Sequence, residues 1–171
     1  MRKMVLSILV GDESGVLSRV AGLFSRRGYN IESLTVGATS TVGMSRMTIV
    51  CSGEENVLDQ IKKQLGKLID VKSMVELPLD SSVFRELILI KIAATASDRQ
   101  DIIAIADIFR AKIVDVSEDS MIIELTGNQS KLSAFTELLK GYKILELART
   151  GITGLSRGQE EPVNYDSVKY V

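Results

Sequence analysis

The sequence predicts an α+β protein made of two copies of one β-α-β-β-α-β unit, each an antiparallel sheet with both helices on one face. Apolar runs and amphipathic segments follow each other in the same order in both halves of the 171 residues. At a constant offset of 74, Met47, Ile49, Gly53, Leu58 and Leu65 are matched by Met121, Ile123, Gly127, Leu132 and Leu139. Both prolines, Pro78 and Pro162, lie outside the copies. This element order is that of the ferredoxin-like unit, whose second and fourth strands are the sheet edges.

The first copy is predicted over residues 1–77. A strand over 4–12 ("MVLSILVGD") precedes a helix over 15–28, whose apolar residues recur at helical spacing. Gly28 ends this helix as a left-handed cap, and residues 29–39 and 45–53 then form a hairpin. A second helix over 54–68 carries acids early and lysines late, which suits the helix dipole. A last strand over 69–77 completes the copy.

Residues 78–83 are a linker, and the second copy is predicted over residues 84–158. Strands are expected at 84–95, 112–117, 120–127 and 143–151, with helices at 98–111 and 128–141. Residues 159–171 are polar and lack periodicity, so we expect a flexible tail.

Composition excludes several classes of function. The chain has no histidine and a single cysteine, which argues against Ser-His-Asp or Cys-His catalysis and against a metal site. Cys51 lies mid-strand and is expected to be a core residue. A net charge of −1 without a basic block argues against nucleic-acid binding. No apolar stretch is long enough to span a bilayer and no signal peptide is evident, so we expect a cytoplasmic protein.

The turn from Asp12 to Gly15 is the candidate binding site. It joins a strand to the start of a helix, where unpaired N–H groups and the helix dipole favour an anion. Gly15 leaves the backbone open to a ligand, and the Asp12 carboxylate suits an ammonium group, so the turn complements a free amino acid. The alternative is that Asp12 or Ser14 simply caps the helix. The corresponding turn of the second copy, "ATASDRQD", has no glycine, which favours one special site in the first copy.

The second strand of the first copy has an unprotected edge. From Tyr29 to Ser45 the only charged residue is Glu32, whereas edge strands of monomers usually carry charges, prolines or bulges. This pattern favours a two-fold dimer with a continuous sheet. Asn30 would then lie near the dimer seam and reach a ligand bound by the other subunit; alternatively it is only a turn residue after Gly28.

The block "GDESGVLSRVAGLFSRRGYNIESLTV" with "SRMTIV" resembles the N-terminal ACT domain of small, regulatory subunits of acetolactate synthase (acetohydroxyacid synthase). The second copy with "ARTGITGLSRG" resembles the C-terminal domain of that family, so the resemblance covers residues 2–158. It implies a non-catalytic chain that binds and activates the large subunit and confers feedback inhibition by valine. The cofactors of that partner, thiamine diphosphate, Mg and FAD, are not expected in this chain.

The resemblance also implies roles for particular residues. Asp12 would face the ammonium group of the effector, the backbone of Gly15 and Val16 would hold its carboxylate, and Leu17 would lie nearby. Asn30 and Ile31 would come from the other subunit of an ACT-domain homodimer. A stand-alone amino-acid sensor would share this turn. An RNA-binding module would carry aromatic residues on its central strands, which are absent here, and a small enzyme would need a catalytic group that the sequence does not reveal.

Overall fold

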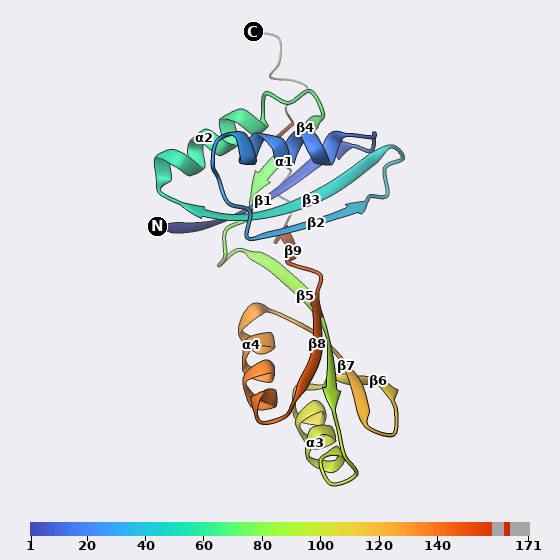
Figure 1. Ribbon diagram of the computed structural model, residues 1–171. Coiled ribbons are helices and arrows are strands. Elements are labelled where there is room, and N and C mark those ends of the chain that lie inside the picture. Colours follow the sequence, from blue (N-terminus) through green and yellow to red (C-terminus); the bar gives the residue numbers. More distant parts are fainter. Residues whose placement is uncertain (159–162, 165–171) are drawn as a thin grey trace. The chain divides into compact units, whose positions relative to one another are not determined.

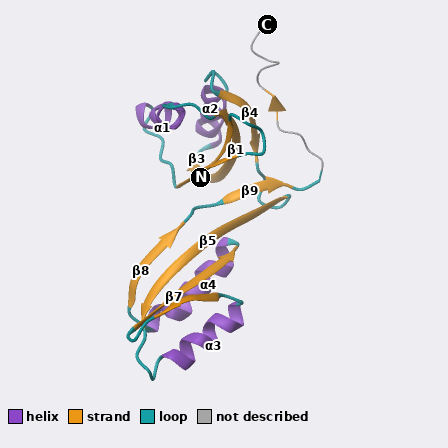
Figure 2. Ribbon diagram, turned by 90° about the vertical axis from the view of Figure 1, so that its right-hand side faces the viewer, coloured by secondary structure: helices purple, strands orange, loops and turns teal. Residues whose placement is uncertain are grey.

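The computed structural model describes residues 1–158 and 163–164. The chain forms two units, one containing Met1–Val83 and the segment that starts at Ile152 (unit 1), the other Phe84–Gly151 (unit 2). Figures 1 and 2 show that each unit is a sheet with both of its helices on one face. The α+β class and the two ferredoxin-like β-α-β-β-α-β units predicted from the sequence are confirmed.

The first six elements of unit 1 follow the predicted order. They are β1 (Arg2–Gly11), α1 (Val16–Arg26), β2 (Ser33–Ala38), β3 (Met44–Gly53), α2 (Glu55–Leu65) and β4 (Val71–Glu76). The strands pair antiparallel in the order β4-β1-β3-β2, with β1 and β3 central. Alternate residues of β1 from Met4 to Val10 face the helices and form one core with Val20, Phe24 and Leu58. Burying an apolar side chain of this size stabilises the fold by about 1.5–3 kcal/mol.

The end of α1 explains the sequence Gly28-Tyr29. Gly28 adopts a left-handed φ of 68°, as its position after the helix predicts. The amide of Tyr29 donates to the Phe24 carbonyl at 3.0 Å, and that of Gly28 donates to the Ser25 carbonyl at 3.2 Å. These two bonds define a Schellman motif, and the Tyr29 ring packs edge-on against Phe24 with 6.5 Å between centroids. The motif fixes the direction in which the chain leaves α1 toward Asn30.

Unit 2 repeats the arrangement. Its elements are β5 (Ser82–Ala93, whose first two residues belong to unit 1), α3 (Arg99–Phe109), β6 (Lys112–Val116), β7 (Ser120–Gly127), α4 (Gln129–Leu138), η1 (Leu139–Gly141) and β8 (Ile144–Arg149). The strand order is β6-β7-β5-β8, so the second and fourth strands are edges, as predicted. A separate core forms around Ile90, Ile123 and Phe135.

Two features of unit 1 differ from the prediction. Its fourth strand, β4, is flanked by β10 (Val163–Asn164), so among the described strands it is not an edge. The rest of the predicted tail, 159–162 and 165–171, lies outside the described residues. β9 (Thr153–Ser156), which the sequence did not predict, pairs with β5. The apolar pattern did not identify either strand because each is short, at four and two residues.

Ile152 is attached to β2 by side chains. Its amide donates to the Ser33 hydroxyl at 3.2 Å, and the Thr35 hydroxyl donates to its carbonyl at 3.1 Å. The main chain of β2 pairs, among the described strands, with β3 alone. Within the described residues, the outer main-chain edge of β2 is therefore left without a strand.

Cys51 is 1% exposed and belongs to the core of unit 1, as expected from its place in a strand. Burial raises the pKa of its thiol to about 11, so the thiolate is disfavoured at neutral pH. Cys51 is therefore a packing residue and no nucleophile.

Candidate functional site

The end of β1 and the start of α1 form the candidate site. The Asp12 amide donates to the Gly43 carbonyl at 2.8 Å, which ties the turn to the β2–β3 hairpin. The Ser45 hydroxyl donates to Asp12 Oδ1 at 3.1 Å and so orients the carboxylate. Asp12 Oδ2 has no hydrogen-bond partner among the described residues. One oxygen of an oriented, exposed carboxylate thus remains available to a donor.

The start of α1 has no side-chain cap, so the alternative in which Asp12 or Ser14 caps the helix is wrong. Gly15 is the N-cap residue and adopts a left-handed φ of 85°, a conformation that favours glycine. In the first turn, the amides of Leu17 and Ser18 have no acceptor within the described part of the chain. These N–H groups carry the positive end of the helix dipole. The start of α1 therefore has free main-chain N–H groups that can donate hydrogen bonds to an anion.

Val16 and Leu17 differ in what they offer. The Val16 side chain is 2% exposed and packs in the core, and its amide makes only a long bond of 3.4 Å to the Glu13 carbonyl. Leu17 is 46% exposed, so its side chain supplies apolar surface beside the free amides. Val16 thus contributes main chain alone, and Leu17 contributes both kinds of group.

Arg19 and Asp70 are two residues of the site that the sequence analysis missed. Arg19 Nε and Nη2 donate to the two carboxylate oxygens of Asp70 at 2.7 and 2.9 Å. Asp70 is nearly buried, and the Gly11 amide donates to its carbonyl, so the ion pair is tied to the end of β1. A Cβ added to Gly15 would lie 3.0 Å from Arg19 Nη1, which has no partner among the described residues. A cationic N–H group therefore borders the open helix start.

Arg19 was detectable in principle. Residues 15 and 19 lie on one helix face because they are four apart, so a charge at position 19 borders whatever binds at position 15. Asp70 had no such signal, since it lies 51 residues away in sequence and meets Arg19 only through the fold.

The Arg19–Asp70 pair predicts a pH-dependent stability. The hydrogen bond from Arg19 lowers the pKa of the Asp70 carboxyl below its ordinary value, against a smaller opposing effect of burial. A depressed carboxyl pKa stabilises the fold above the unfolded value of about 4, and this stabilisation is lost as the pH falls through the folded value. We expect Arg19→Gln to lower the urea midpoint at pH 7, and this deficit to shrink steadily below about pH 4.

Arg26→Gln is the matched control, because Arg26 lies on the same helix and makes no ion pair among the described residues. A deficit of Arg19→Gln that stayed constant from pH 7 to pH 3 would show that the pair does not contribute in this way.

Asn30 and Ile31 lie at the other end of α1. They follow the Schellman motif and precede β2, which starts at Ser33, whereas the sequence predicts a strand from residue 29. Asn30 is exposed, whereas Ile31 packs partly against the core of unit 1. An α-helix of eleven residues is about 16 Å long, so these residues are separated from Gly15 by the length of α1. Within one chain, Asp12, Gly15, Val16 and Leu17 come together, and Asn30 and Ile31 do not join them.

Neither a metal-binding cluster nor a membrane-spanning helix is found among the described residues. No group of three or more Asp, Glu, His or Cys residues there is placed to hold a metal ion. No helix among them has the length and apolar character needed to cross a membrane.

Comparisons with known proteins agree over most of the chain. Residues 6–73 match a family model described as an AHAS small subunit-like ACT domain, and residues 85–158 match one described as the small subunit of acetolactate synthase. The acetolactate synthase small subunit of Mycolicibacterium smegmatis is 55% identical over 153 residues, 90% of each chain. A probable acetolactate synthase small subunit of Methanothermobacter thermautotrophicus is 52% identical over 155 residues, 90% of this chain and 92% of that one.

A solved structure agrees as well. The crystal structure of the acetolactate synthase small subunit from Thermotoga maritima matches with a TM-score of 0.87 and 41% identity. The match covers 94% of this chain and all of that one. With both halves matched by family models and relatives above 50% identity over nine tenths of its length, the chain belongs to the acetolactate synthase small-subunit family.

Proposed function

We propose that this chain activates the catalytic large subunit of acetolactate synthase and makes it sensitive to feedback inhibition by valine. Family membership supports a regulatory role beside a catalytic partner. The observation that carries the effector proposal is the open start of α1, with a free carboxylate oxygen on one side and a guanidinium N–H group on the other. These opposite charges complement a zwitterionic amino acid.

The proposed binding mode uses the groups described above. The effector ammonium donates to Asp12 Oδ2, and the effector carboxylate accepts from main-chain amides of Gly15, Val16 and Leu17. Arg19 Nη1 lies beside the effector carboxylate, and the ion pair with Asp70 fixes the position of the guanidinium. The exposed Leu17 side chain is available to the aliphatic part of a branched-chain ligand.

A homodimer completes the proposed site. Asn30 lies one helix length from Gly15, so it reaches an effector at Gly15 only if it comes from a second copy. Antiparallel pairing of β2 with its counterpart would place the start of one α1 near the end of the other. The unpaired edge of β2 supports this arrangement, because no residue from Ser33 to Ala38 is charged.

Unit 2 offers an internal comparison for that edge. The equivalent strand, β6, carries Lys112 and Asp115 and has a bulge between Ile113 and Asp115. Charges and bulges are the features that keep an edge strand from pairing with another chain. The edge of β6 thus carries features that oppose pairing with another chain, and the edge of β2 does not. This difference supports dimer formation through β2.

Inhibition requires a difference in affinity. Valine shifts an equilibrium between two dimer geometries only if it binds more tightly to the one that activates the large subunit poorly. A tenfold preference corresponds to about 1.4 kcal/mol of coupling, and the same coupling makes the partner weaken valine binding. The cofactors expected for the reaction, thiamine diphosphate, Mg and FAD, are assigned to the large subunit, and no catalytic role is assigned to this chain.

Titration and reconstitution test the proposal. Calorimetry of the purified chain with valine, leucine and isoleucine is expected to show saturable binding, and lysine is expected to show none. Adding the chain to its large subunit is expected to raise acetolactate formation, and adding valine is expected to lower it again. No rise in activity would contradict the regulatory role, and no saturable heat with any branched-chain amino acid would contradict the effector site. Failure to co-purify with a thiamine-diphosphate enzyme would favour a stand-alone sensor.

A further inference from the structure

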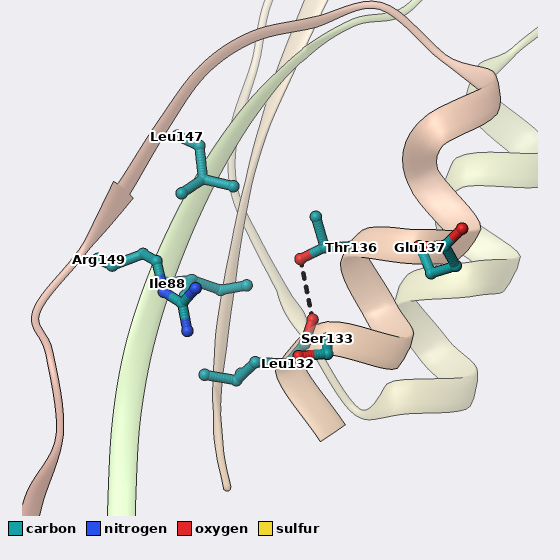
Figure 3. Close-up of a pocket in the computed structure, with 7 residues that line it drawn as sticks. All are labelled: Ile88, Leu132, Ser133, Thr136, Glu137, Leu147 and Arg149. Atoms are coloured by element: carbon teal, nitrogen blue, oxygen red, sulfur yellow. Dashed lines mark hydrogen bonds between the residues drawn. The ribbon is translucent and has the colours of Figure 1, made fainter. Parts of the chain in front are cut away.

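Unit 2 contains a pocket between α4 and the edge strand β8. Its lining residues come from β5, α4 and β8: Ile88, Leu132, Ser133, Thr136, Glu137, Leu147 and Arg149. Figure 3 shows Arg149 and Leu147 on one side of this space and the side chains of α4 on the other. Its volume is about 240 Å³, below the ~300–1,000 Å³ of pockets that hold drug-sized ligands. A ligand here is therefore small.

Arg149 is fixed in the pocket by a carboxylate beneath it. Its Nε and Nη2 donate to the two oxygens of Glu86 at 2.9 and 2.7 Å, and Glu86 is 6% exposed. This bidentate pair orients the guanidinium plane and leaves Nη1 without a partner among the described residues. The Ser133 hydroxyl also has no partner there, whereas the Thr136 hydroxyl donates to the Leu132 carbonyl at 2.9 Å. Two donors are thus free in a pocket lined by three aliphatic and four polar residues.

The same place in unit 1 holds ion pairs. Strand register makes Arg2 equivalent to Glu86, since they pair with Gly53 and Gly127, and makes Glu76 equivalent to Leu147. On the second helices, the 74-residue offset makes Asp59 and Lys62 equivalent to Ser133 and Thr136. In unit 1, Lys62 Nζ contacts Asp59 at 2.9 Å and Glu76 at 3.0 Å, and Arg2 joins Glu76 to Glu55.

The comparison shows how the pocket arises. Unit 2 has a serine, a threonine and a leucine in place of Asp59, Lys62 and Glu76. In unit 1, Lys62 joins α2 to Glu76 of β4, and it also pairs with Asp59 on the same helix. Among the described residues, the serine, threonine and leucine form no such bridge, and Glu86, in the place of Arg2, pairs with the guanidinium of Arg149 on β8.

From this geometry we propose that the pocket of unit 2 binds a small aliphatic carboxylate. The carboxylate accepts hydrogen bonds from Arg149 Nη1 and the Ser133 hydroxyl, and the hydrocarbon part lies against Ile88, Leu132 and Leu147. Hydrogen bonds from an ionised donor to a carboxylate are the stronger kind, and the buried Glu86 keeps that donor in position. All seven lining residues belong to unit 2, so this site is separate from the effector site proposed at Gly15.

The test uses the full-length chain with Gly15→Asp, a change meant to remove binding at α1. The probes are 4-methylpentanoate and leucine, which share the carboxylate and the branched chain and differ in the ammonium group. Amide chemical shifts of the isotope-labelled chain are followed during each titration. We expect saturable shifts at residues 132–137 and 147–149 with at least one probe. Binding of leucine alone would mean that an ammonium group, facing Thr136 and Glu137, is part of recognition.

A filled variant and a matched control decide the outcome. Thr136→Lys with Leu147→Glu restores the lysine–glutamate pair of unit 1 and is expected to weaken binding at least tenfold. Leu138→Lys with Leu145→Glu adds the same residues at exposed positions outside the pocket and is expected to leave affinity within twofold. Saturation by neither probe, shifts located elsewhere, or undiminished affinity in the filled variant would overturn the proposal. The shift map of the unfilled chain remains decisive even if the filled variant does not fold.

Discussion

Gly15→Asp is expected to abolish inhibition by valine while the large subunit remains activated. The new carboxylate lies beside Arg19 and the free amides of α1, where the effector carboxylate is proposed to bind. It occupies that position and repels a second anion. Losing charge-assisted hydrogen bonds of about 1.5–3 kcal/mol weakens binding by roughly 10- to 150-fold. The measurement is acetolactate formation by the reconstituted holoenzyme against valine concentration, paired with calorimetry of the free chain.

Gly158→Asp is the matched control for Gly15→Asp. Gly158 also has a left-handed φ, 76° against 85°, and a Cβ added there meets nothing within 4 Å. Gly158→Asp therefore introduces the same kind of backbone strain and the same negative charge as Gly15→Asp, but at a position outside α1. We expect its valine response to equal that of the unchanged chain. Normal inhibition of the Gly15→Asp holoenzyme would exclude the start of α1 as the effector site.

Val36→Asp is expected to dissociate the proposed homodimer and, with it, to remove the valine response. Val36 lies in β2, is 47% exposed, and belongs to a strand without a charged residue. A two-fold interface would place two such aspartates near each other, and like charges across neighbouring strands are destabilising. The mass by light scattering is expected to fall to that of one chain, and valine titration is expected to lose its heat because Asn30 and Ile31 of the second copy are withdrawn.

Val116→Asp makes the same change at the equivalent position of unit 2. Val36 pairs with Met47, and Val116 pairs with Met121, its counterpart at the offset of 74. Val116 is comparably exposed, at 57%, but its strand already carries charges and a bulge. The dimer is expected to survive this change. A dimeric Val36→Asp chain, or loss of the dimer in both variants, would contradict an interface through β2.

Much of the fold was predictable because its signals are local. Helical spacing marked Val20, Leu23 and Phe24 as one face of α1, and all three are buried. Gly28 was predictable as a left-handed cap because few other residues adopt that conformation at a helix end. The flanking of β4 by β10 was not predictable, because a two-residue strand has no periodicity and is defined only by its partner.

In the candidate site, too, the features with a local sequence signal were predictable and those that depend on long-range contacts were not. Asp12 and Gly15 are only three residues apart in sequence, so their meeting at a strand end and a helix start follows from the element order. The absence of a side-chain cap on α1 did not follow, since Asp12 turns to Ser45 instead, 33 residues away. Arg19 required knowledge of Asp70, which only the packing of β4 against β1 brings near.

The two hydrogen bonds between Ile152 and the hydroxyls of β2 affect how experiments on truncated forms of this protein are interpreted. A polypeptide that stops at the boundary near residue 83 would lose β9 and β10 as well as those bonds, although they belong to the amino-terminal globule. In such a fragment, β2 would lack its hydrogen bonds to Ile152 and β4 would lack its pairing with β10. Any change in its self-association or ligand response would then reflect damage to that globule as much as the missing carboxy-terminal half.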